Sequence, residues 1–112
     1  MKRGEIFYSQ LDPTIGSEIK KTRPVLIISC DANNRGASTV TVIPITSNVE
    51  RVYPFEVLLE TCETQLPKQS KAQCHQIRTL SKLRFIGRPI GRIGILKMRQ
   101  IENALKIHLN LS

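Results

Sequence analysis

The sequence predicts a mainly β protein with one C-terminal helix, built as a partly open barrel or strongly curled sheet. Three observations support this fold class. The apolar residues are mostly aliphatic and rich in isoleucine and valine, which favour strands. They occur in short runs that turn-forming residues interrupt, and only the end of the chain has helical spacing. The 112 residues have the length of one domain, so we expect a single domain over residues 1–112.

Six short segments have the composition or alternation of strands. They are residues 5–11, 25–28, 39–46, 55–59, 72–78 and 89–93. Polar stretches at 14–22 and 62–68 are expected to be loops, and residues 31–36 have the composition of a turn. Pro44 predicts a bend or an edge position in the third strand, because proline has no N–H for the ladder.

The C-terminal segment is predicted to be an amphipathic helix. Its apolar side chains recur every three or four residues, at Met98, Ile101, Leu105 and Leu109. Gly94 is an acceptable N-cap for this helix. Lys97 and Arg99 are expected to face solvent.

The chain is strongly basic, with 17 lysines and arginines against nine acidic residues, a formal charge of +8 and a pI near 9.9. This charge favours a polyanionic partner, whether nucleic acid, an acidic protein segment or a membrane surface, although a merely basic protein is the plainer alternative. No apolar run approaches the roughly 20 residues of a membrane helix. The segment Met1–Glu5 reaches glycine and an acid too early for a signal peptide. We therefore expect a cytoplasmic protein with no membrane partner.

The cysteines do not form a metal-binding pattern. Cys30, Cys62 and Cys74 lie far apart without a C-x-x-C pair, which is typical of reduced thiols. His75 directly follows Cys74, but the chain has only two histidines, so a zinc site is disfavoured. Glycine-rich phosphate loops, clustered carboxylates and a G-x-S-x-G motif are also missing from the sequence. We expect no metal and no cofactor, and a chemistry that depends on cations, hydroxyls and amides.

The densest polar group of residues is the segment 16–24. Its flexible basic loop ends in Arg23, whose guanidinium matches phosphate oxygens and whose backbone is restricted by Pro24. A loop of this kind can bind a phosphate group. The alternative is a solvated loop in which Arg23 pairs with Glu18.

Two further polar groups follow apolar strands. The hydroxyls of Thr46 and Ser47 can bind a phosphate, or they can satisfy amides of a turn. In the predicted strand 72–78, alternation places Gln76 and Arg78 on one face and His75 on the other. Amide and guanidinium groups suit RNA bases and phosphates, and a simple polar outer face is the alternative.

The three polar groups, in their order along the chain, resemble motifs of the MazF/PemK family of ribosome-independent mRNA interferases. The resemblance extends over nearly the whole chain. The matching motifs are Arg3-Gly4-Glu5-Ile6, Leu11-Asp12-Pro13, Gly16-Ser17-Glu18, Thr22-Arg23-Pro24-Val25-Leu26-Ile27, Asp31 with Asn33 or Asn34, Pro44-Ile45-Thr46-Ser47, Gln76-Ile77-Arg78-Thr79, Ala104-Leu105 and Leu109-Asn110-Leu111. The resemblance implies an SH3-like barrel of the plasmid-toxin (CcdB/Kid/MazF-like) type, a homodimer, and a type II toxin with a cognate acidic antitoxin. It also implies metal-independent, sequence-specific cleavage of single-stranded RNA by attack of the 2′-hydroxyl, which leaves a 2′,3′-cyclic phosphate and a 5′-hydroxyl.

The resemblance assigns Arg23 and Thr46 as the catalytic pair. Arg23 would stabilise the developing charge of the phosphorane, and Thr46 would orient the scissile phosphate. A guanidinium stays protonated in proteins, so Arg23 is a poor general base. The residues expected to bind and position RNA, or to support the dimer, are Ser17, Glu18, Lys20, Lys21, Ser47, Gln76 and Arg78.

Two positions depart from the family pattern. Lys21 stands where relatives often carry glycine. Lysine in place of glycine stiffens the loop and adds charge. His75 occupies a place often held by an acid, and a histidine invites a role in proton transfer. The alternation described above turns His75 away from Gln76 and Arg78, which favours a structural role.

Two other functions are possible on the same fold. One is a non-catalytic, gyrase-inhibiting toxin similar to CcdB, which would not require Arg23 with Thr46. The other is a plain RNA-binding module, which would bind RNA in a salt-sensitive way without cutting it. The RNA sequence that is recognised depends on the contours of the loops 17–21 and 48–54, which no spacing rule supplies.

Overall fold

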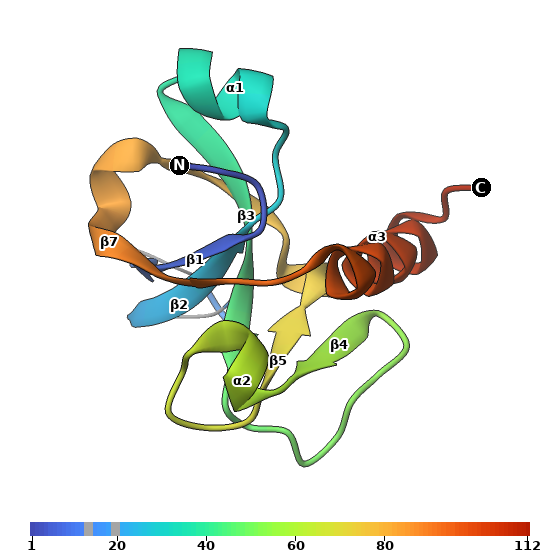
Figure 1. Cartoon of the computed structure of the whole chain (residues 1–112). Helices are drawn as coiled ribbons and strands as arrows, with labels where there is room; N and C mark the ends of the chain where they lie inside the picture. Colours follow the sequence, from blue (N-terminus) through green and yellow to red (C-terminus); the bar gives the residue numbers. More distant parts are fainter. Residues whose placement is uncertain (13–14, 19–20) are drawn as a thin grey trace.

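The computed structural model describes residues 1–12, 15–18 and 21–112, and within them seven antiparallel strands form one curled sheet (Figure 1). The strands are β1 (Glu5–Gln10), β2 (Thr22–Ile27), β3 (Thr39–Thr46), β4 (Glu56–Leu59), β5 (Ser70–Gln73), β6 (Arg78–Ser81) and β7 (Phe85–Arg92). The helices are α1 (Asp31–Gly36), α2 (Thr61–Thr64) and α3 (Ile95–Leu109), with 3₁₀ turns η1 (Cys74–Gln76) and η2 (Lys82–Arg84). The predicted fold class, mainly β with a C-terminal helix, is confirmed.

Strand β3 organises the sheet. The strand order is β4-β5-β3-β2-β1-β7, and β6 pairs with β3 beside this path. β3 pairs with β2 along one side, and on the other side it pairs first with β6 and then with β5. Pro44 lies in this central strand, buried, so the edge position suggested by the sequence is wrong. It lies between the residues that pair with β6 and those that pair with β5.

Alternation along the strands sorts the apolar side chains into two clusters. One cluster contains Phe7, Leu11, Val25, Ile27, Val40, Val42 and Leu80. The other contains Ile6, Leu26, Ile43, Ile45, Val57, Leu59, Leu66, Ala72, Cys74, Ile93, Met98, Ile101 and Ala104. Helix α3 contributes Met98, Ile101 and Ala104 to the second cluster, so its apolar stripe covers one face of the sheet. Figure 1 shows α3 along one side of the sheet and α1 at the end away from α2.

The predicted strand 72–78 is wrong, because two strands and a turn occupy this segment. Ile45 and Val42, three positions apart on β3, pair with Ala72 and Arg78, which are six positions apart. The extra residues between Ala72 and Arg78 cannot all pair with β3, and three of them form η1. The alternation argument for His75 and Gln76 therefore does not apply.

Two other polar segments contain short helices. Residues 31–36 form α1 rather than a turn, and the buried Asn34 fixes this helix through a bond from its Nδ2 to the Ser29 carbonyl at 2.9 Å. Helix α2 overlaps the start of the expected loop 62–68, and reciprocal side-chain caps between Glu60 and Glu63 fix its first turn. Capping groups of this kind satisfy the first amides of a helix that is too short to be recognised by its apolar period.

Helix α3 begins as predicted, at the N-cap Gly94. Its buried stripe ends earlier than expected, because Leu109 is 47% exposed near the helix end. Lys97 does not simply face solvent: its Nζ donates to the Leu58 carbonyl at 3.2 Å and lies 3.7 Å from Glu63. In the described residues, none of the helices combines the length and apolarity needed to cross a membrane.

The three cysteines are free, with Cys30 and Cys62 exposed and Cys74 buried. Burial raises the pKa of the Cys74 thiol to about 12. Cys74 therefore stays protonated near neutral pH and acts as an apolar core residue.

Candidate active site

The two predicted catalytic residues lie on neighbouring strands at the same end of the sheet. The β2–β3 pairing runs from Ile27 and Val42 to Val25 and Pro44, and Arg23 and Thr46 each lie two residues beyond its end. Neighbouring strands of a sheet are about 5 Å apart. Arg23 is exposed and Thr46 is half-buried. The sheet thus places the two residues on neighbouring strands at its rim.

A small hollow of about 140 Å³ opens beside Arg23 and the two chain neighbours of Thr46, Ile45 and Ser47, and Thr46 itself does not line it. It is lined by Tyr8, Arg23, Pro24, Ile45, Ser47, Leu66, Pro67, Lys68 and Ser70. Arg23 and Lys68 supply cations to the hollow, and Ser47 and Ser70 supply hydroxyls. This combination suits an anion with hydrogen-bonding oxygens, such as a phosphate. Lys68 was not predicted, because it reaches the site from the segment before β5, far along the chain from Arg23.

The Thr46 hydroxyl has a structural partner. Its Oγ1 accepts a bond from the Asn48 backbone N–H at 3.2 Å, so the turn role considered for this residue is realised. A hydroxyl has one proton and two lone pairs. Accepting one bond from Asn48 therefore leaves the O–H of Thr46 able to donate to a phosphate oxygen.

The alternative pairing of Arg23 with Glu18 is not observed. The Glu18 carboxylate accepts a bond from the Ile15 N–H at 2.6 Å instead. Within residues 1–12, 15–18 and 21–112, Arg23 forms no ion pair or side-chain hydrogen bond. Its guanidinium is therefore available to an anionic ligand.

The loop that precedes Arg23 carries four of the predicted RNA-binding residues. Ser17 and Glu18 are exposed, and Lys20 lies outside the described residues. Lys21 adopts a φ of +67°, which is unfavourable for a residue with a side chain. A glycine at this position would adopt the same conformation without strain.

Arginines tie the start of this loop to the sheet. Arg78 Nη1 donates to the Leu11 carbonyl at 3.3 Å, and the Leu11 N–H donates to the Lys21 carbonyl at 2.9 Å. Arg84 Nη1 donates to the carbonyls of Gln10 and Asp12, at 3.3 and 2.5 Å. Arg78 therefore supports the rim of the site. The matching role of Arg84 was missed, because it comes from a 3₁₀ turn with no local sequence signal for that contact.

Gln76 and His75 lie in the 3₁₀ turn η1 and not in a strand. The His75 ring packs edge-on against Phe55, with ring centroids 4.8 Å apart, and its Nδ1 is buried without a hydrogen-bond partner among the described residues. Burial is the main cause that lowers the pKa of His75, opposed by the charge of Glu56. The packing of the ring and its lowered pKa favour a structural role for His75.

Acidification is expected to reduce the free energy of unfolding through His75. Its pKa in the folded protein lies below its ordinary value of 6.5, so the unfolded chain binds the proton more readily. The stability contribution is fully present above about pH 6.5 and is lost as the pH falls below it. Urea unfolding from about pH 8 to pH 5 measures this, and a His75→Phe variant should show a smaller loss over that range. Equal pH dependence of both proteins would contradict this assignment.

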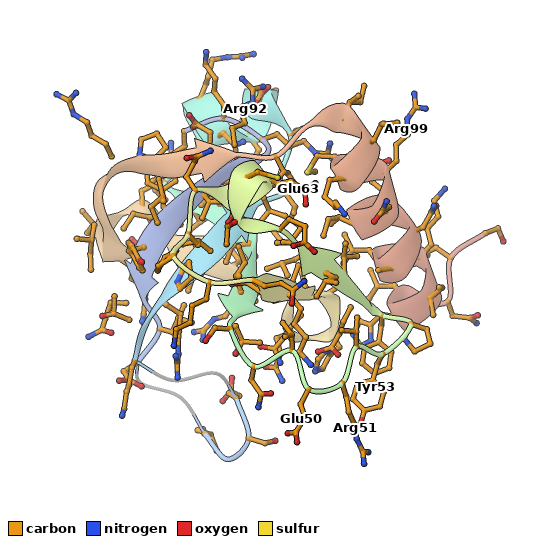
Figure 2. The ribbon with its side chains drawn as sticks, turned by 60° about the horizontal axis from the view of Figure 1, so that its bottom comes forward. Glu50, Arg51, Tyr53, Glu63, Arg92 and Arg99 are labelled. Carbon is orange, nitrogen blue, oxygen red and sulfur yellow. The ribbon has the colours of Figure 1, made fainter. Side chains whose placement is uncertain are left out.

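A larger hollow, of about 630 Å³, lies at the start of α3. Its charges are mixed, because Arg3 Nη2 pairs with Glu102 at 3.0 Å and the Arg3 backbone N–H donates to Asp31 at 2.7 Å. In Figure 2, Arg92 and Arg99, which also line it, lie at the upper part of the molecule, away from Arg51 at the lower rim. Of the predicted site residues, Arg23 and Ser47 line the smaller hollow, and none of those described lines this larger one. Nowhere in the described parts of the chain do three or more His, Cys, Asp or Glu residues gather as metal ligands.

The fold and site define a small, basic β protein with a hollow whose cations and hydroxyls suit an anionic ligand. A family model described as PemK-like, MazF-like toxins of type II toxin–antitoxin systems matches residues 2–109. The chain therefore belongs to this toxin family.

Individual relatives agree with this membership. The chain is 44% identical to "Endoribonuclease MazF9" of Mycobacterium tuberculosis, over 99% of this chain and 98% of that protein. It is similar to the solved structure of the M. tuberculosis toxin MazF-mt6, with a TM-score of 0.82, 28% identity and coverage of 96% and 98% of the two chains. A mycobacterial endoribonuclease solved in complex with its cognate antitoxin has a TM-score of 0.81 and 25% identity, covering 100% of this chain and 97% of that one.

Proposed function

We propose that this toxin is a metal-independent endoribonuclease that cleaves single-stranded mRNA at a specific sequence. The observation that supports the proposal is that Arg23 and Thr46 lie at the same end of adjacent strands, where Arg23 lines a hollow suited to phosphate. The similarity to proteins named as endoribonucleases supports this activity over gyrase inhibition or simple RNA binding.

The proposed reaction is an internal transfer at phosphorus. The ribose 2′-oxygen forms a bond to the phosphorus and loses its proton, while the bond from phosphorus to the 5′-oxygen breaks and that oxygen gains a proton. The products are a 2′,3′-cyclic phosphate and a free 5′-hydroxyl. Charge builds on the phosphoryl oxygens during this step, and fixed donors that meet this charge lower the barrier. Arg23 supplies that charge, and Thr46 orients the phosphate through its hydroxyl.

The other predicted site residues position the RNA. Ser47 lies in the hollow with Arg23, and Arg78 supports the rim. Ser17, Glu18, Lys20 and Lys21 belong to the loop before Arg23, where they contact nucleotides that flank the cut. Gln76 reads or supports RNA from η1.

We also propose the biological setting of this activity. The toxin is cytoplasmic, acts as a homodimer, and consists of one domain over residues 1–112. An acidic antitoxin inhibits it by laying a segment over the basic surface and folding as it binds. The antitoxin complex of the similar mycobacterial endoribonuclease supports such a partner.

Cleavage in a chelator tests the function. The purified protein is incubated with a long single-stranded RNA in excess EDTA, and the new ends are mapped and tested for a cyclic phosphate and a 5′-hydroxyl. We expect cuts at a short recurring sequence with these ends. Activity that disappears on chelation, or RNA that is bound but stays intact, would contradict the proposal.

A further inference from the structure

An aromatic pair stands on the segment between Ser47 and β4. The rings of Tyr53 and Phe55 are nearly parallel, with an interplanar angle of 10° and centroids 5.6 Å apart. Tyr53 is 45% exposed, whereas Phe55 is half-buried. A large aromatic side chain that is held in place and still reaches solvent is a surface on which another flat ring can stack.

A buried ion pair fixes this segment. Lys71 Nζ donates to the Arg51 carbonyl at 2.6 Å and to Glu56 Oε1 at 3.0 Å. The same Glu56 oxygen accepts a bond from the Tyr53 N–H at 3.0 Å. The side chains of Lys71 and Glu56 are only 9% and 1% exposed. The backbone around Tyr53 is therefore held before any ligand binds, which lowers the entropy cost of binding.

The same lysine connects the aromatic pair to the candidate active site. Lys71 is the register partner of Thr46 in the β3–β5 pairing, so the two residues are direct neighbours across strands. Its Nζ also lies 5.9 Å from the centroid of the Tyr53 ring. One side chain thus spans from the strand position beside Thr46 to the aromatic pair.

The surroundings of Tyr53 suit a nucleic acid strand. Figure 2 shows Tyr53 and Arg51 at the lower rim of the molecule, with the Arg51 side chain projecting outward. Phe55 also packs against the His75 ring, so the Tyr53–Phe55 pair, here called the platform, is in contact with η1. Single-stranded RNA is bound by aromatic rings that stack on bases, with nearby cations that hold the backbone.

We propose that Tyr53 stacks on a base of the RNA substrate, close to the nucleotide whose phosphate is cut between Arg23 and Thr46. Tyr53 is a positioning residue and takes no part in the chemical step. This inference rests on the proposed RNA-cutting function. Stacking on a base contributes equally to the substrate and to the transition state, so its loss raises KM and leaves kcat nearly unchanged.

Three variants test the platform. Tyr53→Ala removes the ring, Tyr53→Phe retains it without the hydroxyl, and Val52→Ala shortens the neighbouring side chain, which is 44% exposed. With an RNA that contains a mapped cleavage site, we expect Tyr53→Ala to raise KM about 5- to 100-fold, the loss expected for one stacked base. Tyr53→Phe and Val52→Ala should stay within about twofold of the wild type, because both retain the ring.

The outcomes distinguish a failure of the stacking role of Tyr53 from a failure of the proposed nuclease activity. An unchanged KM for Tyr53→Ala, or an equal rise for Val52→Ala, would overturn the stacking role while leaving the nuclease intact. Binding of a fluorescent 2′-O-methyl RNA with the same sequence, which cannot be cut, is measured for each variant as well. A loss of affinity in Tyr53→Ala alone supports the platform even for a protein without nuclease activity, and equal affinities refute it. Circular dichroism and thermal unfolding confirm that each variant is folded.

Discussion

Arg23→Ala is expected to lower kcat for RNA cleavage by roughly 10²- to 10³-fold, the usual loss when one donor to a developing oxyanion is removed. The reason is geometric, because Arg23 lies at the same end of the sheet as Thr46 and lines the hollow that suits the phosphate. The fold should be unaffected, since the side chain is exposed and makes no ion pair within the described residues. Exposed substitutions of this kind change stability by no more than about 0.5 kcal/mol. Single-turnover cleavage at saturating protein in EDTA measures the chemical step.

Two controls make this result specific. Arg23→Lys retains the positive charge but loses the planar pair of donors, so we expect an intermediate rate. Arg99→Ala removes an equally exposed arginine from α3, away from the hollow, and should cut at the wild-type rate. A cleavage rate of Arg23→Ala that equals that of the wild type would exclude the proposed chemistry, and an equal loss in Arg99→Ala would show only an effect of net charge.

Local sequence patterns predicted the elements that pack by a regular period. The alternation of residues 39–46 and the helical spacing after Gly94 correspond to β3 and α3, because the apolar residues of β3 divide between the two clusters and those of α3 pack on one. The catalytic roles of Arg23 and Thr46 stay a prediction. Each residue lies at the end of a buried run, and it was the resemblance to known toxins, not the spacing, that joined the two as a pair.

Features that depend on pairing between distant segments were not predictable. The chain between Ala72 and Arg78 looks like one strand, and only the register against β3 shows why η1 interrupts it. Lys71 is another example, because a lysine in a polar segment is normally exposed. Its burial follows from the placement of β5 between β3 and β4, where Glu56 supplies the counter-charge.

Lys71→Met is expected to lower the free energy of unfolding by about 3–5 kcal/mol, the loss seen when one member of a buried ion pair is removed. Methionine fills much of the same space but leaves the carboxylate of Glu56, which is 1% exposed, without its counter-charge. It also removes the donor to the Arg51 carbonyl. Lys68→Met, an exposed lysine on the segment before β5, should change stability by no more than about 0.5 kcal/mol. Urea unfolding of both variants at one pH gives the comparison.

A double variant separates the charge from the packing. In Lys71→Met with Glu56→Gln, the uncompensated charge is gone, and the Gln side-chain oxygen still accepts the bond from the Tyr53 N–H that Glu56 accepts now. We expect the double variant to recover more than half of the lost stability, because an isolated buried charge costs far more than a hydrogen-bonded neutral amide. A double variant no more stable than Lys71→Met would mean that the lysine acts through its contacts with the loop backbone. A single variant within about 1 kcal/mol of the wild type would show that water reaches the pair, and that the segment carrying Tyr53 is held by its aromatic contacts instead.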